Sequence, residues 1–405
     1  MRKLIFLLFC GLTISAITPI GRVSAQGTIS DYTVVDTMIS YPNIQSVFRN
    51  NIIATQYGRE VLFLLYYAKK DHDTISVHCF NIDNYTDKPI TIVHSGIAER
   101  LLGLYNYDFS CIAFNGKTLA LSFNQIILLF EPVGDGTNYV FKKKIRTPHD
   151  FRYMEFMNED TLLIADAYLN NRLTRRDVVI STLNITNGAY KSYRPQYDHP
   201  VMTLFRPFDF IDVNDNKIVF ANRNKYSFML LDSQLSIYDS VSREIKQWRP
   251  ISKKEIKKAL SVSKEPVDII DVAHPFFWKS DKLNWIYWID SSHIMTVCGH
   301  NLDKKLPQTI DMWVHKDGQW SLQLKDIKDD CFPNETTRPN MMDINFMERN
   351  KIVMFKDKLV KIDMWGTDID PTKKIPPENI EQIKESLQHH KPYLRVTVYN
   401  HSLCQ

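Results

Sequence analysis

Four aspartates precede strand-like apolar segments at matching positions of a repeated pattern: Asp108, Asp150, Asp209 and Asp343. If the repeats form a ring, these carboxylates come together at the mouth of its central channel. Carboxylate oxygens there could bind a cation, or supply an acid and a base for hydrolysis. Alternatively, each aspartate accepts hydrogen bonds from nearby backbone amides and fixes the turn into its strand. We favour this local role.

Arginines and aromatic residues lie near the same positions. They are Arg152, Arg206, Phe208, Trp278 and Arg338, with Phe276 and Phe277 beside Trp278. A guanidinium group binds a carboxylate through paired hydrogen bonds, and aromatic rings offer stacking surface. These residues are candidates for a ligand-binding patch that accepts a carboxylate, a peptide or a glycan. Packing between repeats is the structural alternative.

Motifs of known catalytic or metal sites are missing from the chain. It contains no GxSxG, HExxH, Walker, GxGxxG, EF-hand or CxxCH pattern. The SxxK match at Ser261–Lys264 lacks the companion motifs of serine acyl-transfer enzymes. The 12 histidines show no paired ligand spacing. We therefore assign no catalytic residue, no metal ligand and no cofactor, and leave open a cation at the central channel.

The elements that would position these side chains are β-hairpins. Six segments each contain an apolar run, a polar turn and a second apolar run: 47–54, 112–121, 154–164, 211–220, 285–295 and 344–354. Asn, Asp, Gly and Ser in the turns are typical of tight hairpins. The spacing leaves room for about four strands per repeat, and a repeated four-strand unit indicates a β-propeller. We predict an all-β, six-bladed β-propeller, with two β-sandwich domains as the competing fold.

Two segments depart from the strand pattern. A capping box begins at Ser252 and predicts a short helix to about Val262, and apolar spacing predicts another helix over Pro377–His390. Near the C-terminus, Leu394, Val396 and Val398 alternate with polar residues as in a strand. We expect this strand to close the ring beside an N-terminal strand over Tyr32–Met38.

The N-terminal segment 1–25 has the pattern of a cleaved signal peptide. Arg2 and Lys3 precede an apolar run of about 14 residues, and Val23-Ser24-Ala25 suits signal peptidase. The run is short of the roughly 20 residues needed to span a bilayer, although a membrane anchor is the alternative. We predict a single propeller domain over 26–405, an exported location that is periplasmic or secreted, and no transmembrane segment after cleavage.

Charge and composition restrict the function further. The chain carries 50 basic and 46 acidic residues, and removal of Arg2, Lys3 and Arg22 with the signal leaves a balance near zero. This argues against a nucleic-acid partner. Only 13 of 405 residues are glycine, which disfavours phosphate-binding loops. Cys79, Cys111 and Cys298 lie in apolar runs and are expected to be buried core thiols.

On the repeated hairpins and the signal ending Ser24-Ala25-Gln26, the chain resembles the secreted six-bladed TolB-like β-propeller family common in Bacteroidota. The resemblance implies the fold and the compartment only. We expect an exported binding module that docks a protein, peptide or glycan where the segments leading into the blades converge. A hydrolase of peptides or carbohydrates, using carboxylates from several blades, is the alternative, and we favour a role without catalysis.

Overall fold

The computed structural model describes the chain in segments. These are 33–40, 52–65, 74–93, 111–123, 125–148, 153–169, 176–195, 211–222, 225–250, 280–300, 308–328, 350–365 and 393–400, with the single positions 151, 252, 254, 255, 258, 261 and 306. They contain 25 β-strands, which agrees with the predicted all-β class. No helix within the described segments is long and apolar enough to cross a membrane.

Four sheets contain four antiparallel strands each. The closing sheet has β23 (Asn350–Met354), β24 (Lys358–Trp365), β25 (Tyr393–Asn400) and β1 (Thr33–Ser40). Two others are β11 (Tyr153–Phe156), β12 (Thr161–Leu169), β13 (Arg176–Asn184) and β14 (Tyr190–Tyr193), and then β15 (Ile211–Asn214), β16 (Lys217–Asn222), β17 (Ser227–Leu231) and β18 (Ile237–Ser242). The fourth is β19 (Lys282–Asp290), β20 (His293–Gly299), β21 (Thr309–Lys316) and β22 (Gln319–Lys328).

The remaining strands form one nine-stranded sheet in the order β2-β3-β4-β6-β10-β9-β8-β7, with β5 on β4. Its first half is β2 (Ile52–Tyr57), β3 (Glu60–Leu65), β4 (Thr74–Asn81), β5 (Thr86–Asp87) and β6 (Ile90–Val93). Its second half is β7 (Cys111–Phe114), β8 (Leu119–Phe123), β9 (Ile126–Val133) and β10 (Asn138–Arg146). The halves are joined by a short parallel pairing of β6 with β10, where Tyr139 lies opposite Ile92.

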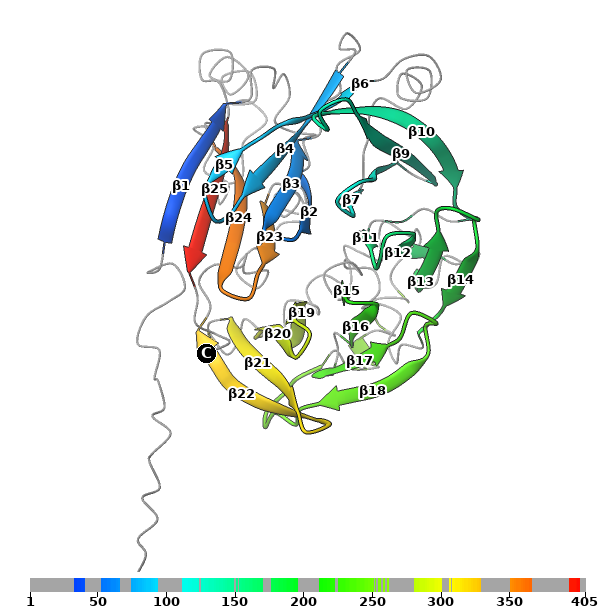
Figure 1. Ribbon diagram of the computed structural model, residues 1–405. Coiled ribbons are helices and arrows are strands. Elements are labelled where there is room, and N and C mark those ends of the chain that lie inside the picture. The colour runs from blue at the N-terminus through cyan, green and yellow to red at the C-terminus, as the bar shows by residue number, and fades with distance from the viewer. Residues whose placement is uncertain are drawn as a thin grey trace, which may run out of the picture.

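The sheets stand around a common centre in a propeller-like arrangement (Figure 1). The innermost strands are β2, β7, β11, β15, β19 and β23. Neighbouring inner strands touch, as β23 does β2 and β15 does β19. The four sheets and the nine-stranded sheet together complete the circuit.

The hydrophobic core lies between neighbouring groups of strands. The described residues form six apolar clusters, each built from two groups that are adjacent around the ring. One lies between the halves of the nine-stranded sheet and contains Leu62 and Phe130, both fully buried. Inner strands such as β7 are buried on both faces, which explains their continuous apolar sequence. Burial of these side chains is the main force holding the ring together.

Four of the six predicted hairpins form where the sequence places them: β7–β8, β11–β12, β15–β16 and β19–β20. In β15–β16 the two-residue turn has positive φ at both Asp215 and Asn216, the conformation that suits the twist of a hairpin. The first and sixth predicted hairpins include the segments 47–51 and 344–349, which lie outside the described residues. Their second arms form β2 and β23, which pair with β3 and β24 through turns at Gly58 and at Lys356-Asp357.

Polar and aromatic contacts join the inner hairpins around the ring. Each crosses from one group of strands to the next, and all but the Trp288–Asp212 bond lie in or beside a hairpin turn. The six are Tyr57–Phe114 with ring centroids 5.3 Å apart, Asn115 Nδ2 to Glu159 O at 2.7 Å, Asn158 Nδ2 to Asn216 Oδ1 at 2.7 Å, Trp288 N to Asp212 Oδ2 at 2.7 Å, Lys356 Nζ to Asp290 Oδ2 at 3.2 Å, and Arg59 Nη1 to Asp357 Oδ1 at 2.6 Å. These contacts tie every seam at the same end of the inner strands.

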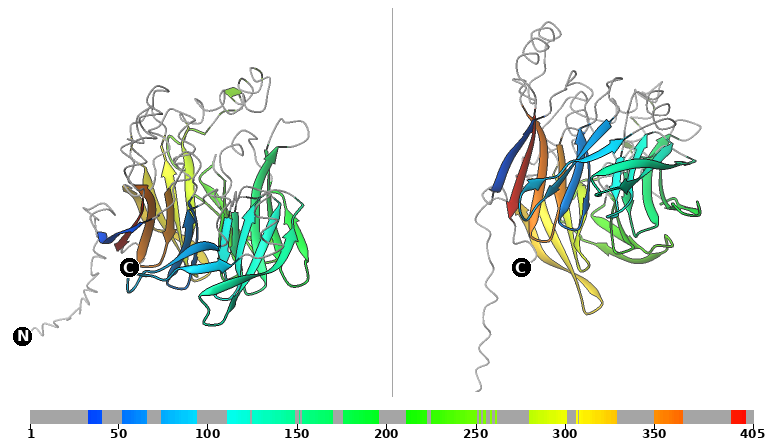
Figure 2. Two further views of the ribbon diagram at one scale, coloured as in Figure 1. Left: turned by 90° about the horizontal axis from the view of Figure 1, so that it is seen from above. Right: turned by 45° about the horizontal axis from the view of Figure 1, so that its top comes forward.

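The predicted closure of the ring is present. β1 pairs antiparallel with β25 over Thr33–Ser40 and Tyr393–Tyr399, and β1 lies at the outer edge of the closing sheet. Figure 2 shows β1 in blue beside β25 in red. The first and last strands of the chain therefore belong to one sheet.

Of the predicted helices, the first is described only at its start. Ser252 Oγ accepts a hydrogen bond from the Glu255 amide at 3.2 Å, and Glu255 Oε2 accepts one from the Ser252 amide at 2.8 Å, which confirms the capping box. The described positions 254, 255, 258 and 261 are helical, but no complete helix lies within the described segments. The segment Pro377–His390 lies outside them. Cys79, Cys111 and Cys298 are buried and in the thiol form, as predicted.

Candidate functional site

Two carboxylates from neighbouring sheets lie on the inner strands. Glu155 belongs to β11 and Asp212 to β15. Each is flanked by apolar residues, as in Ile211-Asp212-Val213, whose apolar side chains pack into the core between the two sheets. The strand alternation therefore leaves the acidic side chain on the face opposite its buried neighbours.

Hydrogen bonds fix both carboxylates. The Tyr153 hydroxyl donates to Glu155 Oε2 at 2.5 Å. Asp212 Oδ1 accepts from the Val213 amide at 2.9 Å, and its Oδ2 accepts from the Trp288 amide of β19 at 2.7 Å. Tyr153 also interacts with Asp212. Through Tyr153 and Trp288, Asp212 of β15 is linked to the inner strands β11 and β19 of the two neighbouring sheets.

Burial makes these acids unusual. Desolvation raises the pKa of Glu155 to about 7, because the hydrogen bond from Tyr153 offsets only part of the cost of burying its charge. The pKa of Asp212 also lies well above its ordinary value, first because of burial and then because of the charge on Glu155. The pKa of the Tyr153 phenol is raised in the same environment. A protonated carboxyl group is therefore available near neutral pH.

The pair is nevertheless only partly buried by surface area, since Tyr153, Glu155 and Asp212 each keep some solvent-accessible surface. This fits side chains that are surrounded by protein but reached by water. Such a group can give or take a proton near neutral pH, which is the property a general acid or base requires.

A second buried polar cluster is fully paired and serves the fold. Tyr226, 3% exposed, donates to Asp311 Oδ2 at 2.6 Å and accepts from Trp313 Nε1 at 3.0 Å. Arg243 forms ion pairs with Asp311 and with Asp326. These bonds cross the seam between the β15–β18 and β19–β22 sheets. Each charge of the cluster therefore faces an opposite charge.

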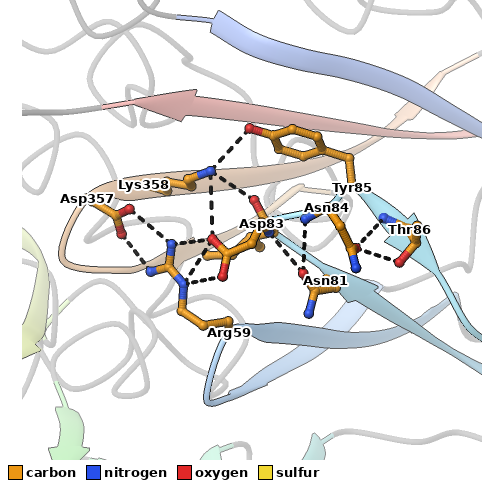
Figure 3. A network of polar contacts seen from close by, with 9 residues as sticks. Arg59, Asn81, Asp83, Asn84, Tyr85, Thr86, Asp357 and Lys358 are labelled. Carbon is orange, nitrogen blue, oxygen red and sulfur yellow. Dashed lines mark hydrogen bonds and ion pairs between the residues drawn. The ribbon is translucent and has the colours of Figure 1, made fainter.

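An ion-pair network joins the closing sheet to the nine-stranded sheet (Figure 3). Arg59 Nη2 contacts Asp83 Oδ1 at 2.7 Å, and its Nη1 contacts Asp357 Oδ1 at 2.6 Å. Lys358 Nζ donates to Ile82 O at 2.9 Å and lies 5.0 Å from the ring centre of Tyr85. Each charge faces an opposite one, so the network is a clasp between sheets.

The residues predicted to form a binding site all lie outside the described residues. They are the carboxylates Asp108, Asp150, Asp209 and Asp343 and the patch Arg152, Arg206, Phe208, Trp278 and Arg338. Their roles stay predictions. Sequence reasoning placed Glu155 and Asp212 in hairpins without giving them a role. The available signal was an acid between two apolar residues in a short inner strand. No group of His, Cys, Asp and Glu in the described segments could hold a metal ion.

The two ends of the strands differ in the connections they carry. At the end where the inner hairpins turn, connections contain two to five residues, such as 58–59, 134–137 and 185–189. At the opposite end, strand ends are joined by the segments 94–110, 194–210, 243–281, 329–349 and 366–392. Since consecutive strands in each sheet are antiparallel, all these long connections begin and end on one face.

Comparisons with known proteins gave matches among solved structures only. No family model matches the chain, and no curated protein matches its sequence. A candidate exported protein from Bacteroides fragilis aligns at a TM-score of 0.48 and 10% identity, over 91% of this chain and 95% of that one. A DUF4221 family member from Bacteroides vulgatus aligns at 0.48 and 9%, over 91% and 98%. The WD40 repeats of RRP9 align at 0.40 and 9%, over 91% and 99%.

Proposed function

We propose that the protein is an exported six-bladed β-propeller that binds a partner at the face carrying its long connections. In this proposal the nine-stranded sheet counts as two blades. Each half has its own inner hairpin, and an apolar cluster separates the halves as it separates other neighbours. The β6–β10 pairing then joins the outer edges of two blades rather than making them one.

The observation that carries the proposal is the unequal length of the connections. Turns at one face have at most five residues and are tied together by the six seam contacts, whereas the segments 243–281 and 366–392 both join strand ends at the other face. Long connections on a rigid scaffold are where binding residues concentrate. The contacts at the face with tight turns hold neighbouring sheets together, and the other face is the proposed docking face.

Seven of the nine residues predicted from the sequence belong to these long connections, and the other two, Asp150 and Arg152, lie in the shorter connection 147–152 between β10 and β11. Arg206, Phe208 and Asp209 lie in 194–210, Trp278 lies in 243–281, and Arg338 and Asp343 lie in 329–349. Their chemistry suits a ligand with carboxylate or hydroxyl groups and a flat apolar face, such as a peptide or a glycan. A cation held by the aspartates would be a further ligand of the same face.

A binding screen tests this function. The chain from residue 26 is presented to arrays of glycans and peptides, and every hit is repeated with Arg206→Ala and Trp278→Ala. The matched control is Lys117→Ala, in the tight turn between β7 and β8. The proposal expects at least tenfold weaker binding for the first two variants, about 1.4 kcal/mol, and unchanged binding for the control. Loss of binding only in Lys117→Ala would place the site on the opposite face.

Export is tested separately. We propose that residues 1–25 are removed by signal peptidase, which N-terminal sequencing of the purified protein would detect as a start at Gln26. Fractionation then distinguishes the periplasm from the medium. A chain that retains residues 1–25 in the membrane fraction would show that the segment is an anchor.

The second candidate function is hydrolysis of peptides or carbohydrates. It is favoured by the Glu155–Asp212 pair, in which acids from neighbouring sheets both have raised pKa values and one lies near neutrality. Turnover of a peptide or oligosaccharide library that is lost in both Glu155→Gln and Asp212→Asn would support catalysis. Turnover that survives both changes would assign it to other residues.

A further inference from the structure

The connection between the β15–β18 and β19–β22 sheets is closed at its base by two hydrogen bonds. The Asp281 amide donates to Arg249 O at 2.8 Å, and Asp281 Oδ2 accepts from the Arg249 amide at 2.6 Å. Asp281 is fully buried, and its Oδ1 lies 3.7 Å from His300 Nδ1. Residues 250–280, called the arm below, therefore begin and end at one paired position.

Both sides of this base are attached to the sheets. Next to Arg249, Trp248 packs against the apolar cluster between the two sheets, with its ring centroid 5.9 Å from that of Tyr226. On the other side, Asp281 leads directly into β19, which begins at Lys282. The base thus has a fixed position on the scaffold, and the arm leaves from it at the face with the long connections.

Glu255 fixes the direction in which the arm begins. Its Oε1 accepts from Arg249 Nη2 at 2.6 Å, and its Oε2 accepts from the Ser252 amide at 2.8 Å and from the Ser252 hydroxyl at 2.7 Å. The capping box is therefore tied to the base of the arm by an ion pair. Both oxygens of Glu255 serve this purpose, and the helical positions that follow start in a set orientation.

The helical positions beside this cap carry lysine. Lys254 and Lys258 are both helical and exposed. They are four residues apart, a spacing at which like charges on a helix repel. Neither lysine forms an ion pair with a described residue, and in the sequence Lys253 and Lys257 accompany them. Since Glu255 is already paired with Arg249, this part of the arm presents positive charge that the chain does not neutralise.

We propose that the arm is an interaction element of the docking face, and that its exposed lysines bind an acidic segment of a protein partner. The inference rests on the proposed docking face and names the chemistry of its partner. Carboxylates of the partner would lie against Lys254 and Lys258 and offset the repulsion between them. The base holds the beginning of the arm in place, so less ordering is needed when the partner binds.

Other anionic partners fit the arm less well. A helix that lies on a membrane inserts apolar side chains into the lipid, whereas the exposed described positions Lys254, Lys258 and Ser261 are all polar. A nucleic-acid-binding protein carries a broad excess of positive charge, whereas the 50 basic and 46 acidic residues of this chain nearly balance. An acidic protein segment requires only the local charge of the arm.

Excision of the arm tests the proposal. Because the Asp281 amide already donates to Arg249 O, the dipeptide Asn-Gly can replace 250–280 as a two-residue turn. Fluorescence anisotropy gives the Kd of a labelled peptide of alternating Glu and Ser, and a peptide of alternating Gln and Ser is the uncharged control. The chain from residue 26 should bind the acidic peptide. Excision should weaken this binding by about tenfold and leave a cooperative thermal transition.

Charge reversal gives a second test at full chain length. Lys254→Glu combined with Lys258→Glu should weaken binding of the acidic peptide by about tenfold, and added salt should weaken binding by the wild type. Lys117→Glu, in the tight turn between β7 and β8, is the matched control and should bind as the wild type does. This pair of variants decides the question if the excised chain does not fold.

Two results would overturn the proposal: equal binding of the acidic peptide by the wild type and the charge-reversed variant, or no binding of that peptide by the wild type. Cosedimentation with phosphatidylglycerol vesicles tests the membrane. Vesicle binding that charge reversal abolishes, without peptide binding, would assign the arm to a lipid surface instead.

The arm and the docking face can fail separately. A glycan or peptide found in the binding screen whose affinity excision leaves unchanged would exclude the arm from the site and keep the docking face. Loss of binding only in Lys117→Ala would instead exclude the docking face itself.

Discussion

The hydroxyl of Tyr226 donates a hydrogen bond to Asp311 Oδ2 at 2.6 Å, across the seam between the β15–β18 and β19–β22 sheets. Asp311 is fully buried and also pairs with Arg243, while Trp313 Nε1 donates to the same Tyr226 oxygen. The Tyr226 hydroxyl thereby fixes the positions of Asp311 and Trp313, which both belong to β21 of the neighbouring sheet. Satisfied buried networks of this kind fix one packing arrangement among many that burial alone would permit.

Tyr226→Phe should lower the free energy of unfolding by about 1–3 kcal/mol, because it leaves Asp311 and Trp313 each short of a buried partner. Urea denaturation measures the change. Tyr238→Phe is the matched control, since Tyr238 on β18 is 49% exposed and its hydroxyl should contribute little. Equal stability of the two variants would mean that the buried network adds nothing to folding.

Glu155→Gln should stabilise the protein increasingly as pH rises. A carboxyl whose pKa rises on folding contributes stability that is complete below its unfolded pKa, near 4.5, and is lost as pH rises through about 7. Removing the titration should therefore raise the unfolding free energy of the variant relative to wild type by about 1–3 kcal/mol at pH 8, with little difference at pH 4. A difference between variant and wild type that does not change with pH would contradict the raised pKa.

Gly116→Ala should cost more than Gly136→Ala. Both glycines have similar positive φ, +88° and +84°, so both replacements introduce similar backbone strain. Only at Gly116 does an added Cβ meet another residue, the Tyr57 ring that packs edge-on against Phe114. The excess should be about 0.5–1.5 kcal/mol, the value of such an aromatic contact. Chemical denaturation of both variants gives the comparison, and equal costs would show that Tyr57 moves aside freely.

Deletion of residues 393–405 should abolish the cooperative thermal transition, because it removes β25 and leaves both β1 and β24 without that partner. Deletion of 401–405 alone, past the end of β25, is the control and should leave the transition in place. Calorimetry distinguishes the two. A shortened chain lacking β25 that still unfolds cooperatively near the wild-type temperature would show that closure is dispensable.

The sequence predicted the strands better than it predicted the site. Asp215 and Asn216 lie between clear apolar runs, so that hairpin was placed correctly, as was the closing strand with Val396 and Val398. The polar pairs Asn50-Asn51 and Arg349-Asn350 resemble turns equally well in the sequence, and in the part of these repeats that the structure describes the hairpin turns follow β2 and β23. Turn chemistry is shared by many loops, and only pairing across the sheet decides which of them closes a hairpin.

The acidic pair was beyond sequence reasoning for a geometric reason. Glu155 and Asp212 are 57 positions apart, and each looks like an ordinary outward-facing strand residue. Their approach depends on how two inner strands are placed around the ring, which no local pattern encodes. Asp108, Asp150, Asp209 and Asp343 were noticed because they repeat. The repeat signals that they share a position in the fold but does not establish a common chemistry.

The pairing of β1 with β25 has a consequence for the order of events during synthesis. β1 is among the earliest strands to be made, yet its partner is not available until residues 393–400 have been translated. Contacts between such distant segments form slowly, because the entropy cost of closing a long loop precedes the stabilisation that the contacts provide. The growing chain therefore remains an open arc with two free edges for nearly the whole of translation, and it becomes a ring in a single late step.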